Sequence, residues 1–245
     1  MESCGRLSIL CGPMWSSKST ELAAKISKYS DIGMKCLFIN HTFDERHGSK
    51  DTKDDGHFSK HGSSSFQLSK SIHKVKVSNL TEITELVKKY DAIAIDECQF
   101  FGEDLVTEVG KWINVSHKVV ICAGLDGDFE CKKIGHLIDL IPYADKVKKL
   151  RARCTICIEE LKRSELKSID AIKAKAPFTA KIVKDGDQIR VGGSESYTSM
   201  CRYHHQRHLS GKSLYEDGEE DVWGEYDPGE YEEVDLKPGQ TINQI

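Results

Sequence analysis

An apolar segment at residues 6–11 (RLSILC) runs directly into the loop sequence GPMWSSKST at residues 12–20, and a helical pattern follows. A loop with Gly, four residues, and then Gly, Lys and Ser or Thr cradles phosphate groups. Its backbone N–H groups curl around phosphate oxygens while the Lys reaches the terminal phosphate. The helix after the loop directs the positive end of its dipole at the same anion. The order of strand, loop and helix therefore predicts a nucleotide-binding α/β fold.

Ser17 occupies the position where this loop pattern has its second Gly. That position often requires a left-handed backbone, which costs a non-Gly residue roughly 1 kcal/mol. Leu22, Ile26 and Tyr29 recur at helical spacing after the loop and support the phosphate-binding interpretation. The alternative is an ordinary strand-to-helix turn that happens to contain Lys, Ser and Thr.

A length of 245 residues allows either one large domain or a main domain with a small appendage. No stretch of 18 apolar residues and no charged-then-apolar leader is visible, so we expect a cytoplasmic protein without a membrane partner. The nine cysteines are odd in number, which favours reduced thiols and metal ligation over a disulfide framework. Three of them lie in apolar runs and are expected in the core: Cys11, Cys36 and Cys122.

Charge is unevenly distributed, because residues 215–235 contain eleven Asp or Glu and no Lys or Arg. Taking those eleven negative charges out of the net charge of −4 leaves +7 on the rest of the chain. The Lys residues there are scattered and lack an aromatic platform, so we expect no nucleic-acid partner. The predicted organisation is a nucleotide-binding domain (1–150), a smaller lobe (151–212) and an acidic, disordered tail (213–245).

Short apolar runs alternate with helical patterns in the first half of the chain. The runs lie at 7–11, 36–39, 92–95 and 119–123, and the helical patterns at 21–29, 81–89 and 104–115. This alternation predicts a parallel sheet covered by helices on both faces. A long exposed loop with at most a weak hairpin is expected at 40–71. Another β-hairpin is expected where residues 178–183 and 188–191 flank a turn.

Asp96 and Glu97 follow the third apolar run, at the carboxyl end of a predicted strand. Ligands of open α/β sheets bind at that end. An Asp there commonly helps to hold Mg²⁺ in phosphate-loop enzymes, and a neighbouring Glu can accept a proton from an attacking hydroxyl. The alternative is a helix N-cap with an acidic first turn.

Two pairs of metal-ligand residues lie in the smaller lobe: Cys154 with Cys157, and Cys201 with His204 after 43 intervening residues. Two residues separate the ligands of each pair, a spacing that suits tetrahedral Zn²⁺ in a closed, structural site. Free or redox-active thiols are the alternative. His205 and His208 compete for the fourth position, but only His204 preserves the two-residue spacing.

Five separated motifs together resemble the type II thymidine kinase family over roughly residues 5–205. They are GPMWSSKSTEL at 12–22, DER at 44–46, DECQFF at 96–101, LDGDF at 125–129 and the split pairs of metal ligands. The resemblance implies transfer of the γ-phosphate of ATP to the 5′-hydroxyl of thymidine or deoxyuridine, giving the monophosphate in nucleotide salvage for DNA synthesis. It further implies structural Zn²⁺, Mg²⁺ bound with ATP, and a homotetramer or homodimer.

The resemblance also assigns site residues by matching position. It implies Glu97 as the catalytic base, with Ser19 and Asp96 as the Mg²⁺ ligands. The implied ATP-binding residues are Gly12, Pro13, Met14, Trp15, Ser16, Ser17, Lys18, Ser19, Asp44, Glu45, Arg46, Asp96 and Gln99. The implied nucleoside-binding residues are Met14, Phe100, Leu125, Phe129, Ser164, Gln188, Ile189, Arg190, Val191, Gly192 and Tyr197. Residues 188–193 correspond to a lasso-like loop that closes over the base with main-chain hydrogen bonds.

Two other classes of function stay open at this stage. One is a zinc-dependent nucleotide-binding or nucleic-acid-binding regulator that lost catalysis through Ser17. The other is a phosphate-loop ATPase that drives a partner, although the sequence contains no recognisable partner-coupling segment. Phosphate transfer from ATP to thymidine separates the family interpretation from both.

Overall fold

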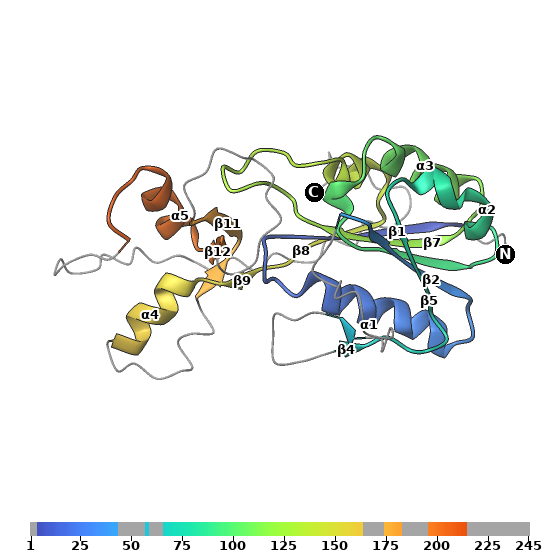
Figure 1. Cartoon of the computed structure of the whole chain (residues 1–245), viewed down its shortest axis with the longest axis horizontal. Coiled ribbons are helices and arrows are strands. Elements are labelled where there is room, and N and C mark those ends of the chain that lie inside the picture. Colours follow the sequence, from blue (N-terminus) through green and yellow to red (C-terminus); the bar gives the residue numbers. More distant parts are fainter. Residues whose placement is uncertain (1–3, 44–56, 59–65, 164–173, 183–195, 215–245) are drawn as a thin grey trace, which may run out of the picture. The chain divides into compact units, whose positions relative to one another are not determined.

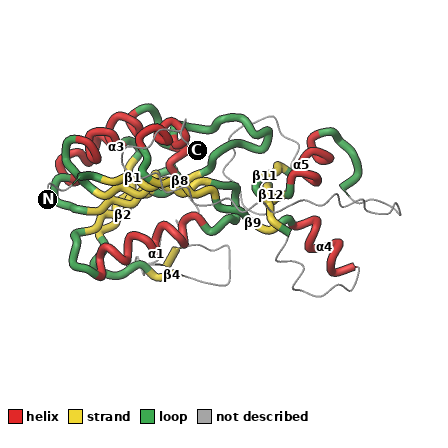
Figure 2. Tube along the Cα trace, turned by 180° about the vertical axis from the view of Figure 1, so that it is seen from behind, coloured by secondary structure: helices red, strands yellow, loops and turns green. Residues whose placement is uncertain are grey.

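The computed structural model describes residues 4–43, 57–58, 66–163, 174–182 and 196–214, and its main feature is a six-stranded sheet (Figures 1 and 2). Every neighbouring pair of its strands runs parallel. The predicted α/β fold with a parallel sheet is confirmed, and all four predicted runs are strands in it. From edge to edge the order is β5 (His73–Val77), β2 (Cys36–His41), β6 (Ala92–Ile95), β7 (Val119–Gly124), β1 (Arg6–Cys11) and β8 (Lys146–Lys149).

Each face of the sheet has its own apolar core, because successive side chains of a strand point to opposite faces. Leu37 of β2 packs in one core with Leu105 of helix α3 (Asp104–Asn114). Phe38, the next residue, packs in the other core against helix α1 (Lys18–Asp31). Figures 1 and 2 show α1 on one side of the sheet and α3 on the other. The buried residues of α1 in this core are Leu22, Ala23 and Ile26.

The helix predicted at residues 81–89 is shorter than expected. It starts as a 3₁₀ turn, η2 (Leu80–Ile83), and continues as a single α-helical turn, α2 (Thr84–Val87). The side chain of Asn79 accepts a hydrogen bond from Thr81 N at 2.9 Å, and Glu82 Oε1 accepts one from Asn79 N at 2.9 Å. This reciprocal capping box fixes where the segment begins, and the 3₁₀ turn occupies its first four residues.

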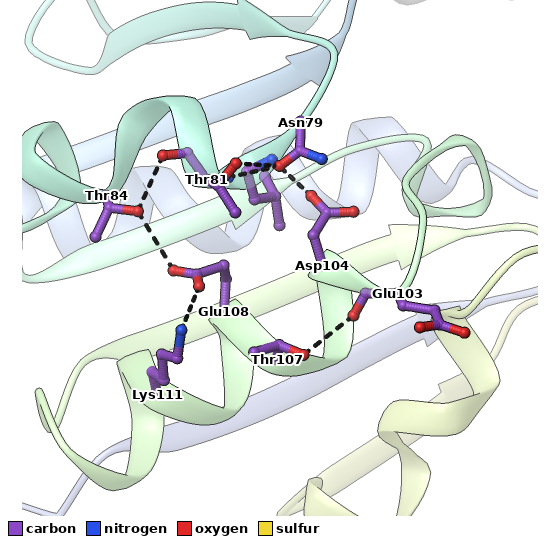
Figure 3. Close-up of polar contacts among 9 residues, drawn as sticks. Asn79, Thr81, Thr84, Glu103, Asp104, Thr107, Glu108 and Lys111 are labelled. Atoms are coloured by element: carbon purple, nitrogen blue, oxygen red, sulfur yellow. Dashed lines mark hydrogen bonds and ion pairs between the residues drawn. The ribbon is translucent and has the colours of Figure 1, made fainter.

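A polar network joins this segment to α3 (Figure 3). Asp104 Oδ2 accepts a hydrogen bond from Leu80 N at 2.7 Å. The buried carboxylate of Glu108 accepts one from Lys111 Nζ at 2.7 Å and a longer one from Thr84 Oγ1 at 3.5 Å. These contacts hold the two helical segments together on one face of the sheet.

The segment after the main sheet contains short antiparallel strand pairs and two helices. Its small apolar core includes Cys154, Ala180 and Met200. Strand β11 was predicted, and its partner within the described residues is β12, with Phe178 opposite Met200. The predicted partner at 188–191 lies outside the described residues. The elements are β9 (Ala152–Arg153) with β10 (Lys175–Ala176), β11 (Phe178–Lys181) with β12 (Tyr197–Met200), α4 (Thr155–Arg163) and α5 (Arg202–Leu209).

The predicted long loop at 40–71 contains a two-residue antiparallel pair, β3 (His57–Phe58) with β4 (Phe66–Gln67), in agreement with a weak hairpin. The described residues fall within one compact unit that ends at Tyr215. A domain boundary at residue 150 stays a prediction, and the acidic segment from residue 215 onward lies outside the described residues. Among the described helices, none is long and apolar enough to cross a bilayer.

Candidate functional site

The loop between β1 and α1 has an unusual backbone. Gly12 has a φ of 145°, and a methyl group added there would lie 2.5 Å from the carbonyl oxygen of Leu150, so this position requires Gly. Trp15 and Ser17 are left-handed, with φ of 59° and 62°. The strained conformation predicted for Ser17 is therefore confirmed. Left-handed non-Gly residues cost of order 1–3 kcal/mol and cluster at ligand-binding segments.

The loop ends at the N-terminus of the 14-residue helix α1, where the backbone N–H groups are oriented for an anion. Ser17 is the N-cap residue and makes no side-chain capping hydrogen bond. Lys18 is buried, and its Nζ donates a hydrogen bond to the carbonyl oxygen of Pro13 at 2.6 Å. Ser16 Oγ donates to the same carbonyl at 2.8 Å. The ammonium group is thus held inside the curve of the loop.

Asp96 and Glu97 follow β6 at its carboxyl end, as predicted. Asp96 is 3% exposed, and its Oδ1 accepts a hydrogen bond from the Glu97 backbone N–H at 2.9 Å. Glu97 is left-handed, with a φ of 51°, and precedes the short 3₁₀ turn η3 (Cys98–Phe100). Its carboxylate accepts a hydrogen bond from Gln99 Nε2 at 2.6 Å. One carboxylate is therefore buried against the backbone, and the other is half-exposed with a side-chain donor.

The residues predicted to bind a nucleoside come from several elements. Leu125 follows β7, and its backbone N–H donates to Gln99 Oε1 at 3.0 Å. Phe100 lies in an aromatic cluster at the ends of β2 and β6, with ring centroids 5.9 Å from His41 and 5.3 Å from Phe43. The sequence did not single out His41 or Phe43, because neither belongs to a motif. Tyr197 is buried in β12.

The loop between β1 and α1 contacts the segment that carries the predicted metal ligands. Thr179 Oγ1 of β11 accepts a hydrogen bond from Met14 N at 3.0 Å. Trp15 packs against the apolar core around Cys154. No local pattern in the sequence indicates Thr179, which lies 165 residues from its partner. The two segments meet through a hydrogen bond from the Met14 backbone to the Thr179 side chain and through apolar packing of Trp15.

Cys154, Cys157, Cys201 and His204 come together as predicted, with their potential ligand atoms all within 4.8 Å of one another. The sulfur atoms of Cys157 and Cys201 are 3.8 Å apart, which matches the separation of about 3.8 Å for two sulfurs each about 2.3 Å from one tetrahedral Zn²⁺. His204 Nδ1 lies 3.3–3.4 Å from the three sulfurs. The group fits Zn²⁺ in both donor type and spacing.

The electrostatics of this group favour a cation at its centre. Burial lowers the pKa of His204, but hydrogen bonds to Cys154 and Cys201 and the charge of their sulfurs raise it overall, to about 10. Hydrogen bonds from Cys157 and Cys201 lower the pKa of Cys154. A set of sulfurs that stabilises an imidazolium proton also suits a metal cation. On the outer side of the ring, His204 Nε2 lies 3.3 Å from Glu160 Oε1, where metal-ligating histidines commonly meet a carboxylate.

The two competing histidines have other partners. His205 Nε2 lies 2.8 Å from the carbonyl oxygen of Phe129, and His208 Nε2 lies 2.7 Å from the carbonyl oxygen of Lys181. Both rings are therefore hydrogen-bonded to backbone carbonyls. The prediction of His204 as the fourth ligand agrees with this geometry. The remaining predicted site residues lie outside the described residues: Asp44, Glu45, Arg46, Ser164, Gln188, Ile189, Arg190, Val191 and Gly192.

Comparison with known proteins adds an independent line of evidence. The family model described as thymidine kinase matches residues 5–205. The chain is 34% identical over 198 residues to the thymidine kinase of Amsacta moorei entomopoxvirus, covering 80% of this chain and 95% of that protein. It is 32% identical to thymidine kinase 1 of Dictyostelium discoideum (81% and 76% covered) and 30% identical to the cytosolic thymidine kinase of Bos taurus (88% and 78% covered). The chain therefore belongs to the thymidine kinase family.

Proposed function

We propose that this protein transfers the γ-phosphate of ATP to the 5′-hydroxyl of thymidine, or of deoxyuridine, and releases the nucleoside monophosphate and ADP. The observation that carries the proposal is the common edge of the parallel sheet. The phosphate loop follows β1, the Asp96 and Glu97 carboxylates follow β6, and Leu125 follows β7. Ligands of open α/β sheets bind at this edge.

ATP would bind with its phosphates in the loop from Gly12 to Ser19, against the N-terminus of α1. Lys18 would exchange its hydrogen bond with the Pro13 carbonyl for one with a phosphate oxygen, because a charge-assisted bond to phosphate is the stronger one. Mg²⁺ held by Ser19 and Asp96 would neutralise phosphate charge. We place Asp44, Glu45 and Arg46 near the phosphates as well, by the family motif.

Glu97 is proposed as the base that accepts the proton of the 5′-hydroxyl. As that oxygen forms a bond to the γ-phosphorus, the bond from this phosphorus to the bridging oxygen of ADP breaks, and ADP leaves with the electron pair. Enzymes catalyse such transfers mainly by positioning and by stabilising charge. The carboxylate of Glu97 is partly exposed and held by a hydrogen bond from Gln99, which suits it to accept a proton from a bound hydroxyl.

The nucleoside would lie among Met14, Phe100, Leu125, Phe129 and Tyr197, with Ser164 and the backbone of residues 188–192 completing the pocket. Zn²⁺ bound by the three cysteines and His204 would supply folding stability to the segments that carry these residues. A cytoplasmic homotetramer or homodimer is part of the same proposal.

Transfer of radiolabelled γ-phosphate from ATP to thymidine tests the function directly. The wild-type protein is expected to form labelled thymidine monophosphate, and the Glu97→Gln variant is expected to bind both substrates while its turnover falls by roughly 10²–10⁴. Glu103→Gln is the matched control, because Glu103 is an exposed carboxylate six residues further on. Near-normal turnover in Glu97→Gln would refute the role of this base. ATP hydrolysis in the absence of any nucleoside, with no labelled product, would favour an ATPase instead.

A further inference from the structure

We propose that Gln99 is a positioning residue, which holds the carboxylate of Glu97 at the angle required for proton transfer and connects it to the nucleoside-binding segment at Leu125. Its side-chain amide bridges the two, with Nε2 2.6 Å from Glu97 Oε2 and Oε1 3.0 Å from the backbone nitrogen of Leu125. This inference rests on the proposed function, because it assigns Gln99 a role in the same reaction.

The orientation of the amide follows from the chemistry of its two partners. A backbone N–H can only donate, so the atom of Gln99 that faces Leu125 must be the carbonyl oxygen. The amino group then faces Glu97, whose ionised carboxylate can only accept. The two hydrogen bonds support each other, and reversing the amide would break both.

The packing around Gln99 leaves its side chain little room to move. Gln99 is 4% exposed. A methyl group added at Gly124 would lie 2.6 Å from Gln99 Oε1, and one added at Gly135 would lie 2.3 Å from the Gln99 carbonyl oxygen. Gly135 also has a left-handed φ of 57°. Two positions without a side chain therefore form the space in which Gln99 lies.

Glu97 depends on such support because its own backbone is strained. Its left-handed conformation stays populated only where neighbouring groups fix it. The hydrogen bond to Leu125 also joins the segment after β6 to the segment after β7, because Gln99 and Leu125 are 26 residues apart in the chain. A shift of the backbone at Leu125 would therefore move the carboxylate of Glu97, and a shift of Glu97 would move Leu125.

This role differs from direct ATP binding, the assignment that the family motif suggests for Gln99. A residue that binds ATP would raise the KM for ATP when it is replaced. A positioning residue lowers kcat while the KM for ATP stays the same, because the lost interaction matters for the chemical step alone.

The test uses two variants of the full-length protein in steady-state thymidine kinase assays. Gln99→Met keeps the length of the side chain but removes both hydrogen bonds, and Gln99→Glu keeps the acceptor for Leu125 but opposes Glu97 with a second carboxylate. Both are expected to lower kcat about 10- to 100-fold, the effect of losing one hydrogen bond to a charged group, with the KM for ATP within about twofold of wild type. Only Gln99→Met is expected to raise the KM for thymidine.

A double-variant comparison separates positioning from a general structural role. In a Glu97→Gln background the Gln99→Met change is expected to lower kcat by less than about twofold, because the group that it positions is already absent. Gln206→Met, at an exposed glutamine of α5, is the control. A raised KM for ATP, an unchanged kcat, or equal losses in both backgrounds would each overturn the inference. If Gln99→Met does not fold, as judged by circular dichroism, Gln99→Glu carries the test in the same two backgrounds. Absence of thymidine phosphorylation by the wild type would instead refute the proposed function.

Discussion

His205 Nε2 donates a hydrogen bond to the carbonyl oxygen of Phe129 at 2.8 Å, and the preceding residue, His204, is a candidate zinc ligand. Because a carbonyl can only accept, the hydrogen bond requires a proton on Nε2. The His205 ring also stacks on Phe178, with centroids 5.0 Å apart. Adjacent residues of α5 therefore connect the metal group with a residue predicted to contact the nucleoside.

Replacing His205 with Phe tests whether this connection matters for nucleoside binding. Phe keeps an aromatic ring that can stack on Phe178 but cannot donate to the Phe129 carbonyl. We expect the KM for thymidine to rise about fivefold, which corresponds to the loss of one hydrogen bond worth about 1 kcal/mol. Zinc content, measured by atomic absorption, is expected to stay the same, because His204 still provides its ligand atom.

The matched control for this prediction is Gln206→Ala, a change at an exposed residue of the same helix. It is expected to alter neither zinc content nor the KM for thymidine. Loss of zinc from His205→Phe would show that the histidine acts on the metal site itself. An unchanged KM would show that the Phe129 carbonyl does not need this donor.

Ser17→Gly should make the protein more stable. Gly adopts the left-handed backbone of position 17 without strain, so the substitution removes a strain of roughly 1 kcal/mol from the folded state. The greater conformational freedom of Gly in the unfolded chain offsets part of this gain. The net increase in the free energy of unfolding is expected to be about 0.5 kcal/mol in urea titrations. Ser17→Ala keeps the strain and is expected to be neutral. If Ala and Gly are equally stabilising, the left-handed strain is not the cause.

The parts of the fold that the sequence predicts are those with a local signature. The loop from Gly12 to Thr20 and the pairs around Cys154 and Cys201 are recognisable from spacing alone. The edge strands β5 and β8 were not predicted, because their sequences, HKVKV and KVKK, contain few apolar residues. All four residues of β8 are exposed. These strands form because a parallel neighbour supplies backbone hydrogen bonds, and that information lies elsewhere in the chain.

In the candidate site, too, features with a local sequence pattern are predictable and contacts between distant residues are not. Asp96 and Glu97 are predictable because two carboxylates directly follow an apolar run. The bond from Met14 to Thr179 and that from His205 to Phe129 join residues 165 and 76 positions apart. Such contacts depend on tertiary packing, which a residue pattern along one segment does not encode.

Removing a candidate zinc ligand should unfold the segment that it holds. Cys157→Ser is expected to lower bound zinc from about one atom per chain to nearly none, because a closed tetrahedral site needs all four ligands. It should also lower the melting temperature, since metal binding contributes to folding. Cys4→Ser, at an exposed cysteine, is the control. Full zinc occupancy in Cys157→Ser would contradict the assigned ligand set, and a chelator should reproduce the Cys157→Ser phenotype in the wild type.

The ion pair on α3 predicts a loss of stability that depends on whether one charge or both are removed. The side chain of Glu108 is 4% exposed and that of Lys111 is 59% exposed, so solvent screens only one end of the pair. Lys111→Met leaves a buried carboxylate without its cation and is expected to lower the free energy of unfolding by about 1 kcal/mol.

Glu108→Leu combined with Lys111→Met removes both charges and should restore much of that loss, because the carboxylate is no longer buried without its cation. Urea titrations of the two variants measure the difference, and a double variant less stable than Lys111→Met would mean that Glu108 is stabilised mainly by its bond with Thr84. Kinase activity should be unchanged in both, since neither residue belongs to the strand ends that carry the proposed site.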